Sequence, residues 1–373
     1  AGFIGCEPSE CVVIEDSING IKAGHAAGMK VIHIPDTIEI NDDIRSLTSV
    51  VCHSLSDVPD IIDTWNEGKV VDVEGYYENA KINRVYVDRV HVKKAFAEYT
   101  AAYNADDPKI KLKIDHTYRV AALCERIAKA AGMCAYDVEL AWLSGMLHDV
   151  GRFEQIKRYN TFSDADSVDH AKFGADLLFK DGLISTFLKG MVKCTGYKPG
   201  ALEDRYDSDG VFLYDRLNKS DMEMLELAIR CHNMYRIPQG LNRREQAFCN
   251  VLRDADKVDI FKVNIDTPLE EIYNTTTEEL MKSDITDEVL KAFDEEHCIL
   301  KAIRRTPADT VIGHVSLAYE LVYDESVRIT VEQGYLAKLM HFHSDNEETN
   351  RKMAMVREKM DSYVKKRIGE KDA

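Results

Sequence analysis

Residues 143–152 (LSGMLHDVGR) constrain the fold more than any other stretch of the chain. Their apolar residues lie at helical spacing, which predicts a buried helix. His148 and Asp149 stand side by side within this apolar run. Burying an imidazole and a carboxylate is unfavourable unless they are paired or bind a ligand. A cation satisfies both, because histidine nitrogen and aspartate oxygen are standard metal donors. The stretch therefore predicts a metal site if other segments supply further donors.

Length and charge limit the classes of partner. The chain has 373 residues, which suits two domains, and a formal net charge of -17. This charge argues against a broad nucleic-acid or anionic-membrane surface, which needs clustered Lys and Arg, so neither partner is expected. A small phosphorylated substrate stays possible, because a metal supplies local positive charge. Nine scattered cysteines without a CxxC pair predict reduced thiols and a cytoplasmic protein. The sequence has no signal-peptide pattern and no run of about 18 apolar residues.

The first 66 residues have an α/β pattern. An apolar strand over 10–14, a helix over 18–29 and a strand over 30–35 predict one βαβ unit. Glu15 and Asp16 follow the first strand, at the edge where open α/β sheets place their active sites. In the alternative interpretation, the acidic pair only caps the N-terminus of the helix.

Residues 8–35, which include VVIEDSINGIKAGHAAGMKVI, resemble the C-terminal end of a haloacid-dehalogenase (HAD) superfamily hydrolase of the β-phosphoglucomutase-like type. The resemblance implies that Glu15 and Asp16 help to hold Mg²⁺ and that Gly20 lies in a turn near that site. The sequence contains no DxDxT nucleophile loop, so a phosphoaspartate intermediate cannot form. We expect a partial Rossmann-like segment that is inactive in this chain, with Glu15 and Asp16 as a vestigial metal pair. Because Ala1 is not a natural start, truncation of a longer enzyme is favoured over decay.

The rest of the chain predicts a linker over residues 67–88 and an all-α domain over 89–373. Helical periodicity without any long strand-like alternation supports this division. The expected helices cover 85–103, 110–133, 137–149, 167–179, 222–231, 245–261, 287–297, 310–321 and 332–340.

Four further donors follow these helices, and each is a weak signal alone. His116 and His170 lie near helix starts, where a histidine is usually an ordinary surface or capping residue. His232 ends a helix, where an imidazole also serves as a partner of the helix dipole. Asp256 lies between apolar residues on both sides, although Asp254 and Asp259 are alternatives nearby.

The order of these residues is more specific. The segments DHTYRV, GMLHDVGRFEQ and RDADKVDIF resemble the H…HD…D core of the HD-domain superfamily, an all-α bundle. Two extra histidines resemble the longer H…HD…H…H…D set of dinuclear HD proteins, including the HD-GYP phosphodiesterases. The GYP signature is replaced by IRCHNMYRIPQG, which argues against a cyclic-dinucleotide substrate. The resemblance covers residues 110–261, and it implies six metal ligands: His116, His148, Asp149, His170, His232 and Asp256.

Two cations a few Å apart need a bridging carboxylate, and Asp149 is the expected bridge. The other ligands then divide into His116, His148 and Asp256 for one ion, and His170 and His232 for the second. So many imidazoles favour Mn, Fe, Co, Ni or Zn over Mg. A hydroxide between two such ions attacks a phosphate whose oxygens the metals hold. This chemistry needs no protein nucleophile, which fits the lack of a Ser–His–Asp or GxSxG signal.

Basic residues near the motifs are candidates for binding the phosphate. Arg152 follows Asp149 by three positions, and Lys257 is next to Asp256, although adjacent helical side chains diverge by about 100°. We predict that Asp149, Arg152 and Lys257 are catalytic, with Lys172 and Arg236 as further candidates; a surface charge is the alternative for each base. The polar stretch 153–169 predicts a loop that gates the site mouth or a plain solvated loop.

Three functions stay open from the sequence. A metal-dependent phosphohydrolase acting on a nucleotide or another small phosphate ester is favoured. The same six ligands also resemble the myo-inositol oxygenase-like HD proteins, which use a mixed-valent diiron pair and O₂. A non-catalytic module that binds metal or nucleotide is the third, and the intact ligand set argues against it.

Overall fold

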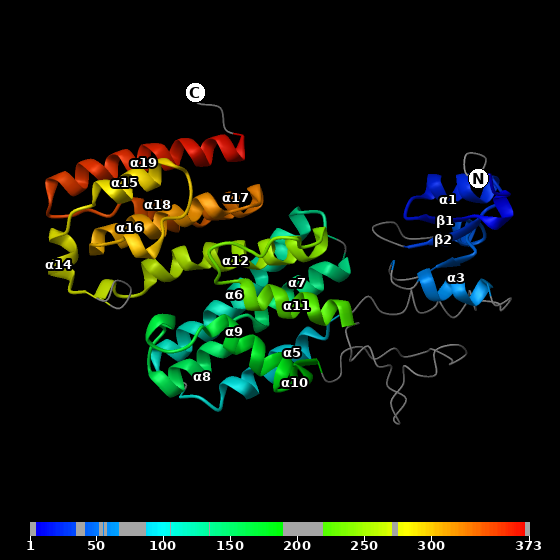
Figure 1. Ribbon diagram of the computed structural model, residues 1–373, viewed down its shortest axis with the longest axis horizontal. Coiled ribbons are helices and arrows are strands. Elements are labelled where there is room, and N and C mark those ends of the chain that lie inside the picture. Colours follow the sequence, from blue (N-terminus) through cyan, green and yellow to red (C-terminus); the bar gives the residue numbers. More distant parts are fainter. Residues whose placement is uncertain are drawn as a thin grey trace. The chain divides into compact units, whose positions relative to one another are not determined.

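The computed structural model describes residues 5–34, 42–51, 55, 58–66, 87–104, 106–133, 135–188, 219–270 and 275–369. The chain divides into two compact units (Figure 1). One comprises Ala1–Val92 and Leu188–Asn218, and the other comprises Lys93–Phe187 and Lys219–Ala373. Residues 67–86 of the predicted linker lie outside the described residues, so the predicted domain boundaries stay predictions.

The first unit contains a three-stranded parallel sheet in the order β1-β2-β3. Strand β1 (Val12–Glu15) is followed by α1 (Ile18–Ala26) and β2 (Lys30–His33), which confirms the predicted strand, helix and strand. Strand β3 (Val50–Val51) adds to the edge of β2, and α2 (Asp42–Arg45) and α3 (Val58–Asn66) flank it in sequence. A short 3-10 turn, η1 (Pro8–Glu10), precedes the sheet.

Apolar side chains cover both faces of this sheet. Val31 and Ile32 point to opposite faces, as successive strand residues do, and they belong to separate buried clusters. Ile32 packs with Val58 and Ile61 of α3, whereas Val31 packs with Ile21 of α1. The small sheet is therefore stabilised by burial of apolar area on two sides.

The rest of the described chain is helical, as predicted for an HD-type domain. The α-helices are α5 (Arg89–Thr100), α6 (Pro108–Ala130), α7 (Ala135–Leu147), α8 (Val150–Tyr159), α9 (His170–Ala175), α10 (Ile184–Leu188), α11 (Lys219–Cys231), α12 (Arg243–Asp266), α14 (Thr277–Lys282), α15 (Asp287–Asp294), α16 (Pro307–Val315), α17 (Asp324–Gln333), α18 (Tyr335–Met340) and α19 (Glu347–Ile368). A π-helical segment, Asp176–Lys180, follows α9, and 3-10 turns cover Asp164–Asp166, Lys301–Ile303 and Ser316–Glu320.

Local sequence explains where the two longest site helices begin. Asp107 accepts a hydrogen bond from Lys109 N, and Pro108 occupies the first turn of α6. Asn242 and Glu245 form a capping box at the start of α12. Helix α6 packs along α7, because Gly145 brings them close: a methyl group there would lie 2.6 Å from Ala121 Cα.

Helix α12 joins the helices that carry the predicted ligands to the C-terminal helices, since it contacts α6, α7 and α11 as well as α17 and α18. The fully buried carboxylate of Asp254 accepts hydrogen bonds from Val322 N at 2.9 Å, Tyr323 N at 3.0 Å and Ser326 Oγ at 2.7 Å. Asp254 therefore ties the middle of α12 to the beginning of α17.

The predicted loop over 153–169 is wrong in its first half. Helix α8 continues to Tyr159, because Val150, Phe153 and Ile156 form a buried face at helical spacing. Asn160 ends the helix in a left-handed conformation, with φ 53°. The connection to α9 is limited to residues 160–169.

Other boundaries also differ from the prediction. The helix expected over 332–340 is the end of α17 and then α18, separated by Gly334 at φ 69°. The helix expected from 167 begins at His170, because the Asp169 side chain accepts from Lys172 N as its cap. None of the helices within the described ranges combines the length and apolarity that a membrane crossing requires.

Candidate metal centre

Six helices and their ends bring the six predicted ligands together. His116 lies on α6, Asp256 lies on α12, and His148 and Asp149 lie where α7 ends and α8 begins. His170 is the first residue of α9, and His232 directly follows α11. The side chains of His116, His148, Asp149 and His232 are at most 2% exposed, and that of Asp256 is 16% exposed.

Asp149 lies between two pairs of histidines. Its Oδ2 is 3.6 Å from His116 Nε2 and 3.5 Å from His148 Nε2. Its Oδ1 is 3.6 Å from His170 Nε2 and 3.8 Å from His232 Nε2. Among the described residues, this buried Oδ1 has no hydrogen-bond partner. The two oxygens of one carboxylate thus face separate pairs of imidazoles.

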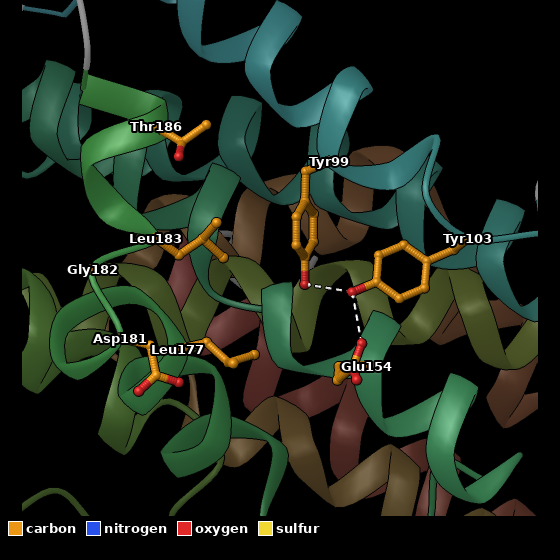
Figure 2. A pocket seen from close by; sticks show the side chains of 8 residues that line it. All are labelled: Tyr99, Tyr103, Glu154, Leu177, Asp181, Gly182, Leu183 and Thr186. Carbon is orange, nitrogen blue, oxygen red and sulfur yellow. Dashed lines mark hydrogen bonds between the residues drawn. The ribbon is translucent and has the colours of Figure 1, made fainter.

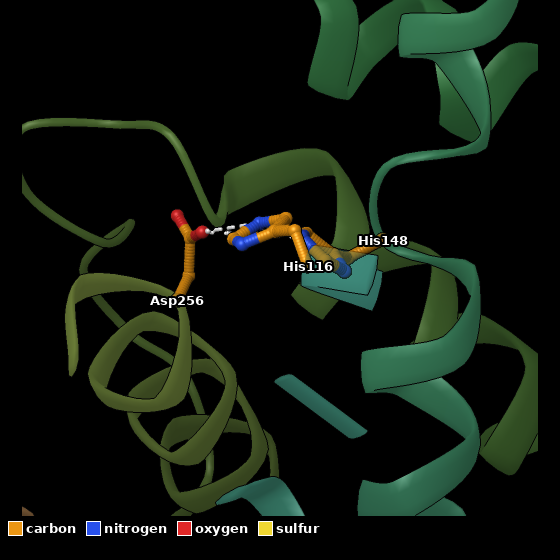
Figure 3. Close-up of side chains that lie close together, drawn as sticks. All are labelled: His116, His148 and Asp256. Atoms are coloured by element: carbon orange, nitrogen blue, oxygen red, sulfur yellow. Dashed lines mark hydrogen bonds and ion pairs between the residues drawn. The ribbon is translucent and has the colours of Figure 1, made fainter. Parts of the chain in front are cut away.

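Asp256 completes the first of these groups. Its Oδ1 lies 3.2 Å from His116 Nε2 and 3.9 Å from His148 Nε2. Figure 3 shows the carboxylate facing the ring of His116 from α12, with His148 beside that ring. His116, His148 and Asp256 also form a group whose donor atoms all lie within 4.8 Å of one another.

The hydrogen bonds of His116 and His148 determine which ring nitrogen is free. His116 Nδ1 donates to Asp259 Oδ2 at 2.6 Å, and His148 Nδ1 donates to the Gly145 carbonyl at 2.8 Å. A neutral imidazole has a single N–H, so Nε2 of each ring carries a lone pair. Both lone pairs then face Asp149 and Asp256.

His170 and His232 repeat this arrangement. His170 Nδ1 donates to Asp164 Oδ2 at 2.7 Å, and His232 Nδ1 donates to the Ile229 carbonyl at 2.7 Å. Their Nε2 atoms therefore carry lone pairs as well. Such N–H bonds to a carboxylate or carbonyl are the usual support of metal-binding histidines.

The free nitrogens lie closer together than lone pairs favour. The distance between His116 Nε2 and His148 Nε2 is 3.3 Å, and that between His170 Nε2 and His232 Nε2 is 3.1 Å. Two lone pairs repel at this distance, but donors about 3 Å apart suit a shared cation with bonds of about 2.1 Å. Together with the buried Oδ1 of Asp149, these contacts show that the residues fit a metal centre.

Two charged groups hold the supporting carboxylates. Arg119 donates to Asp259 at 2.6 and 2.9 Å, and Arg152 Nη1 donates to Asp164 Oδ1 at 2.9 Å. Asp259 was noted in the sequence only as an alternative to Asp256. Its signal was its position three residues after Asp256, which places both carboxylates on one face of α12.

Electrostatics differ between the two histidine pairs. Burial and Lys113 lower the pKa of His116, but the carboxylates of Asp256 and Asp259 outweigh them and raise it. Burial lowers the pKa of His148 despite the nearby Asp149. Burial would raise the pKa of Asp149, yet Lys113 and the neighbouring histidines hold it well below its usual range. The carboxylate is therefore ionised and available to cations.

The second pair stays neutral at neutral pH. Burial, aided by Arg152, lowers the pKa of His170 to about 4. Burial, aided by His148, lowers the pKa of His232 to about 4. Protons therefore do not compete with a cation for these two nitrogens near pH 7.

Arg152 lies where the sequence predicted it, next to Asp149. Its Nε is 3.8 Å from Asp149 Oδ1 and is buried without a hydrogen-bond partner among the described residues. Its Nη1 donates to the Phe162 carbonyl at 2.7 Å. Arg152 Nε is thus a buried donor that lies near Asp149 and makes no hydrogen bond to the described residues.

The structure does not bring the other predicted bases into this group. Lys257 is buried on α12, and burial together with Arg253 lowers its pKa to about 8. No hydrogen bond or ion pair joins Lys257 to the four histidines or Asp149 in the described part of the chain, so its catalytic role stays a prediction. Lys172 pairs with Asp169 at 2.9 Å, and Arg236 lies 5.4 Å from the ring centre of Tyr235.

Lys113 is a site residue that was not predicted. Its Nζ lies 2.7 Å from Asp149 Oδ2, and its side chain is 17% exposed. Its position three residues before His116 places it on the same face of α6, which was the available signal. Lys113 and Arg152 both lie against Phe162, with their charged groups 5.5 and 5.6 Å from the ring centre.

The connection over residues 160–169 is held in place by side chains of α8. Gln155, which is fully buried, donates to Asp164 Oδ1 at 3.0 Å, Ser167 Oγ at 2.8 Å and the Val168 carbonyl at 3.0 Å. Arg152 holds the same segment through Phe162 and Asp164. These contacts favour a fixed wall of the site over the predicted gate.

A pocket of about 450 Å³ lies beside α5 and α8 (Figure 2). Along its wall, Tyr103 Oη donates to Glu154 at 3.1 Å and lies 3.0 Å from Tyr99 Oη. Tyr99 Oη donates in turn to the Val150 carbonyl at 3.0 Å, so the pocket wall supports the backbone next to Asp149.

Glu15 and Asp16 lie where the sequence placed them, at the end of β1. Ser17, rather than the acidic pair, caps α1, because its Oγ accepts from Gly20 N at 3.1 Å. Ser17 Oγ also donates to Glu15 at 3.1 Å. A methyl group on Gly20 would lie 2.0 Å from the Glu15 carboxylate, so a larger residue there would require the Glu15 side chain to move. Within the described residues, neither acid belongs to a group of three metal donors.

Comparison with known protein families gives a match within the helical part of the chain. Residues 114–297 match the family described as HD domain, and all six predicted ligands fall inside that range. Proteins with this domain are generally metal-dependent phosphohydrolases. The chain is 39% identical over 57 residues to an uncharacterized protein of Schizosaccharomyces pombe; the match covers 14% of this chain and 23% of that protein. The chain thus spans less than a quarter of that relative. No solved structure matches the chain.

Proposed function

Because residues 114–297 form an HD domain, we propose that the chain is a metal-dependent phosphohydrolase acting on a nucleotide or another small phosphate ester. One observation carries the proposal. Four buried imidazoles direct the lone pairs of Nε2 at the two oxygens of one ionised carboxylate, Asp149. Without a cation this arrangement would be unfavourable in a packed helical core, because the lone pairs lie close together and repel.

We propose two ions. Asp149 Oδ2 would serve an ion held by His116, His148 and Asp256, and Asp149 Oδ1 would serve an ion held by His170 and His232. The predominance of imidazole favours Mn, Fe, Co, Ni or Zn over Mg. When bound, such ions supply a water of lowered pKa and positive charge for the phosphate oxygens.

The chain's own residues orient the ligands and the substrate. Asp259 and Asp164 fix the rings of His116 and His170 through their Nδ1–H groups. Arg152 lies beside Asp149, 3.8 Å from Oδ1, and its Nε makes no hydrogen bond to the described residues, which suits a phosphate oxygen. Burial of the donors excludes bulk water and strengthens these interactions.

Metal analysis by mass spectrometry followed by a phosphatase screen tests the proposal. We expect about two transition-metal ions per chain and release of phosphate from nucleotide or sugar-phosphate substrates with Mn²⁺. His148→Ala should lose metal and activity, whereas His341→Ala, a histidine outside the site, should keep both. Iron content with O₂ consumption and no phosphate release would instead favour the diiron oxygenase. Metal binding without any turnover would favour a regulatory module.

We also propose that residues 1–66 are the end of a HAD-type α/β fold. The parallel sheet, Glu15 at the end of β1 and the close approach of Gly20 support this origin. Mg²⁺ would bind at Glu15 and Asp16 only if residues outside this chain completed the site. Glu15→Gln together with Asp16→Asn should therefore leave phosphate release unchanged; loss of activity in this variant would contradict the proposal.

A further inference from the structure

Lys113 forms an ion pair with the carboxylate of Asp149. Its ammonium contacts Asp149 Oδ2 at 2.7 Å, the oxygen that also faces His116 and His148 at 3.6 and 3.5 Å. The Asp149 side chain is 2% exposed, so this buried charge needs a cationic partner when metal is absent. Lys113 provides that partner from one turn before His116 on α6.

A divalent cation at this oxygen changes the position of Lys113. The ion and the ammonium carry like charges and compete for the same carboxylate oxygen, so their mutual repulsion weakens the Lys113–Asp149 contact. A lysine side chain is flexible enough to move its charge by several Å. The ammonium of Lys113 already lies 5.5 Å from the ring centre of Phe162, against which Arg152 also lies.

The displaced ammonium of Lys113 would then form a pair of neighbouring cations with Arg152. Arg152 Nε is buried without a hydrogen-bond partner among the described residues, beside Asp149 Oδ1. Two cations next to one apolar ring repel each other unless an anion lies between them. A phosphate group, which carries up to two negative charges and several acceptor oxygens, has the chemistry that both donors require.

We propose that Lys113 alternates between two partners: it neutralises Asp149 in the metal-free protein and binds the substrate phosphate, beside Arg152, once metal occupies the carboxylate. This inference rests on the proposed function, because it assumes a metal centre and a phosphate ester. It adds a substrate-binding residue and a metal-dependent change of that residue's partner.

The variant Lys113→Met removes the charge and keeps most of the length of the side chain. Lys109→Met is the matched control, because Lys109 lies one turn earlier on α6 and its Nζ contacts Asn160 instead of Asp149. Both variants change the net charge equally, so any difference between them reports the contact with Asp149.

Isothermal titration calorimetry with Mn²⁺ on the metal-free proteins gives the first readout. We expect Lys113→Met to bind Mn²⁺ about tenfold more tightly than Lys109→Met, because no ammonium competes for Asp149. Its Tm without metal should be lower, and the increase in Tm on adding Mn²⁺ should be larger, because a ligand of the native state stabilises it. Unchanged or weaker Mn²⁺ binding would overturn the proposal.

Binding of inorganic phosphate to the Mn²⁺-loaded proteins gives the second readout. We expect about tenfold weaker binding in Lys113→Met, the effect of one charge-assisted hydrogen bond, and a raised KM with a nearly unchanged kcat. If Lys113→Met does not fold without metal, purification with Mn²⁺ still allows this measurement. Equal phosphate affinity in the two loaded variants would also overturn the proposal.

The wild-type protein separates this inference from the proposed function. If it binds Mn²⁺ and releases phosphate while Lys113→Met behaves like Lys109→Met, only the role of Lys113 is wrong. If the wild-type protein binds no metal, both proposals are wrong.

Discussion

The two halves of the donor set are alike in geometry and different in charge. The first half, His116, His148 and Asp256, includes a carboxylate and has Asp259 behind His116. The second half, His170 and His232, contains only neutral donors and has Arg152 next to it. The pKa of His116 is raised, whereas the pKa values of His170 and His232 are lowered to about 4.

This difference indicates that donors of one type lie in unequal electrostatic surroundings when the neighbouring charges differ. Carboxylates around the first half favour a cation there, and they raise the pKa of His116. The second half has the shared carboxylate of Asp149 and the Asp164 carboxylate behind His170, but Arg152 lies against both acids. We expect the first half to bind the tighter ion and the second half to bind the ion that exchanges more readily.

Removing the Asp149 side chain should abolish metal binding at both halves of the donor set. Asp149→Ala deletes the oxygens that face both histidine pairs, so we expect loss of both ions and a fall in kcat/KM of about 10³-fold or more, which is about 4 kcal/mol. Metal content and phosphate release measure this change. Asp166→Asn, in the exposed turn before α9, is the control that removes an equal charge.

Activity that persists in Asp149→Ala would contradict both the shared carboxylate and the metal-dependent reaction. Loss of a single ion with the other retained would show that the halves are independent, and Asp149 would not be a bridge.

Changing the supporting carboxylates should affect each half separately. Asp259→Asn weakens the acceptor behind His116, and Asp164→Asn weakens the acceptor behind His170. Loss of such a partner lowers metal affinity by about 10- to 100-fold. Calorimetric titration with Mn²⁺ should show the first variant weakening the tighter step and the second weakening the looser step. The comparison of the halves is wrong if both variants affect the same step.

The free energy of unfolding of the metal-free protein should change with pH in opposite directions for histidines of the two halves. The pKa of His232 is about 4 in the folded protein and about 6.5 when unfolded, so the unfolded state binds the proton first as pH falls. The contribution of His232 to the free energy of unfolding is complete above pH 6.5 and is lost towards pH 4. The loss is about 2 kcal/mol between pH 6.5 and 5. The raised pKa of His116 acts oppositely: its contribution is complete below pH 6.5 and is lost as pH rises through the folded value.

Urea unfolding with a chelator at pH 5, 6.5 and 8 measures these effects. His232→Gln should reduce the loss of stability between pH 6.5 and 5, whereas His116→Gln should remove the stability that the protein gains as pH falls from 8 to 6.5. An identical response of the two variants would show that their imidazoles do not differ in protonation.

Much of the helical site could be predicted from the sequence. Periodicity placed His116, His170 and Asp256 on helices that the structure contains, and the apolar run predicted that His148 and Asp149 are buried. Helix α8 was missed because polar residues between Phe153 and Asp169 obscured the short apolar face of Val150, Phe153 and Ile156.

The supporting contacts could not be predicted, because they join residues that are distant in sequence. Lys113 meets Asp149 across 36 positions, and His116 meets Asp259 across 143. Helical spacing assigns each residue to a face, but the packing of α6 against α7 and α12 decides which faces meet. The first-unit sheet was easier, since its strand–helix–strand pattern is local.

The buried carboxylate of Asp254 determines where an expression fragment of the helical region should end. Asp256, two residues later on α12, is a predicted ligand, while the hydrogen bonds of Asp254 reach Val322, Tyr323 and Ser326. Those donors lie beyond residue 297, where the match to the HD family ends. An expression fragment cut at residue 297 would remove the hydrogen-bond donors Val322, Tyr323 and Ser326 from the Asp254 carboxylate on α12. The smallest fragment suited to biochemical study therefore extends past α17.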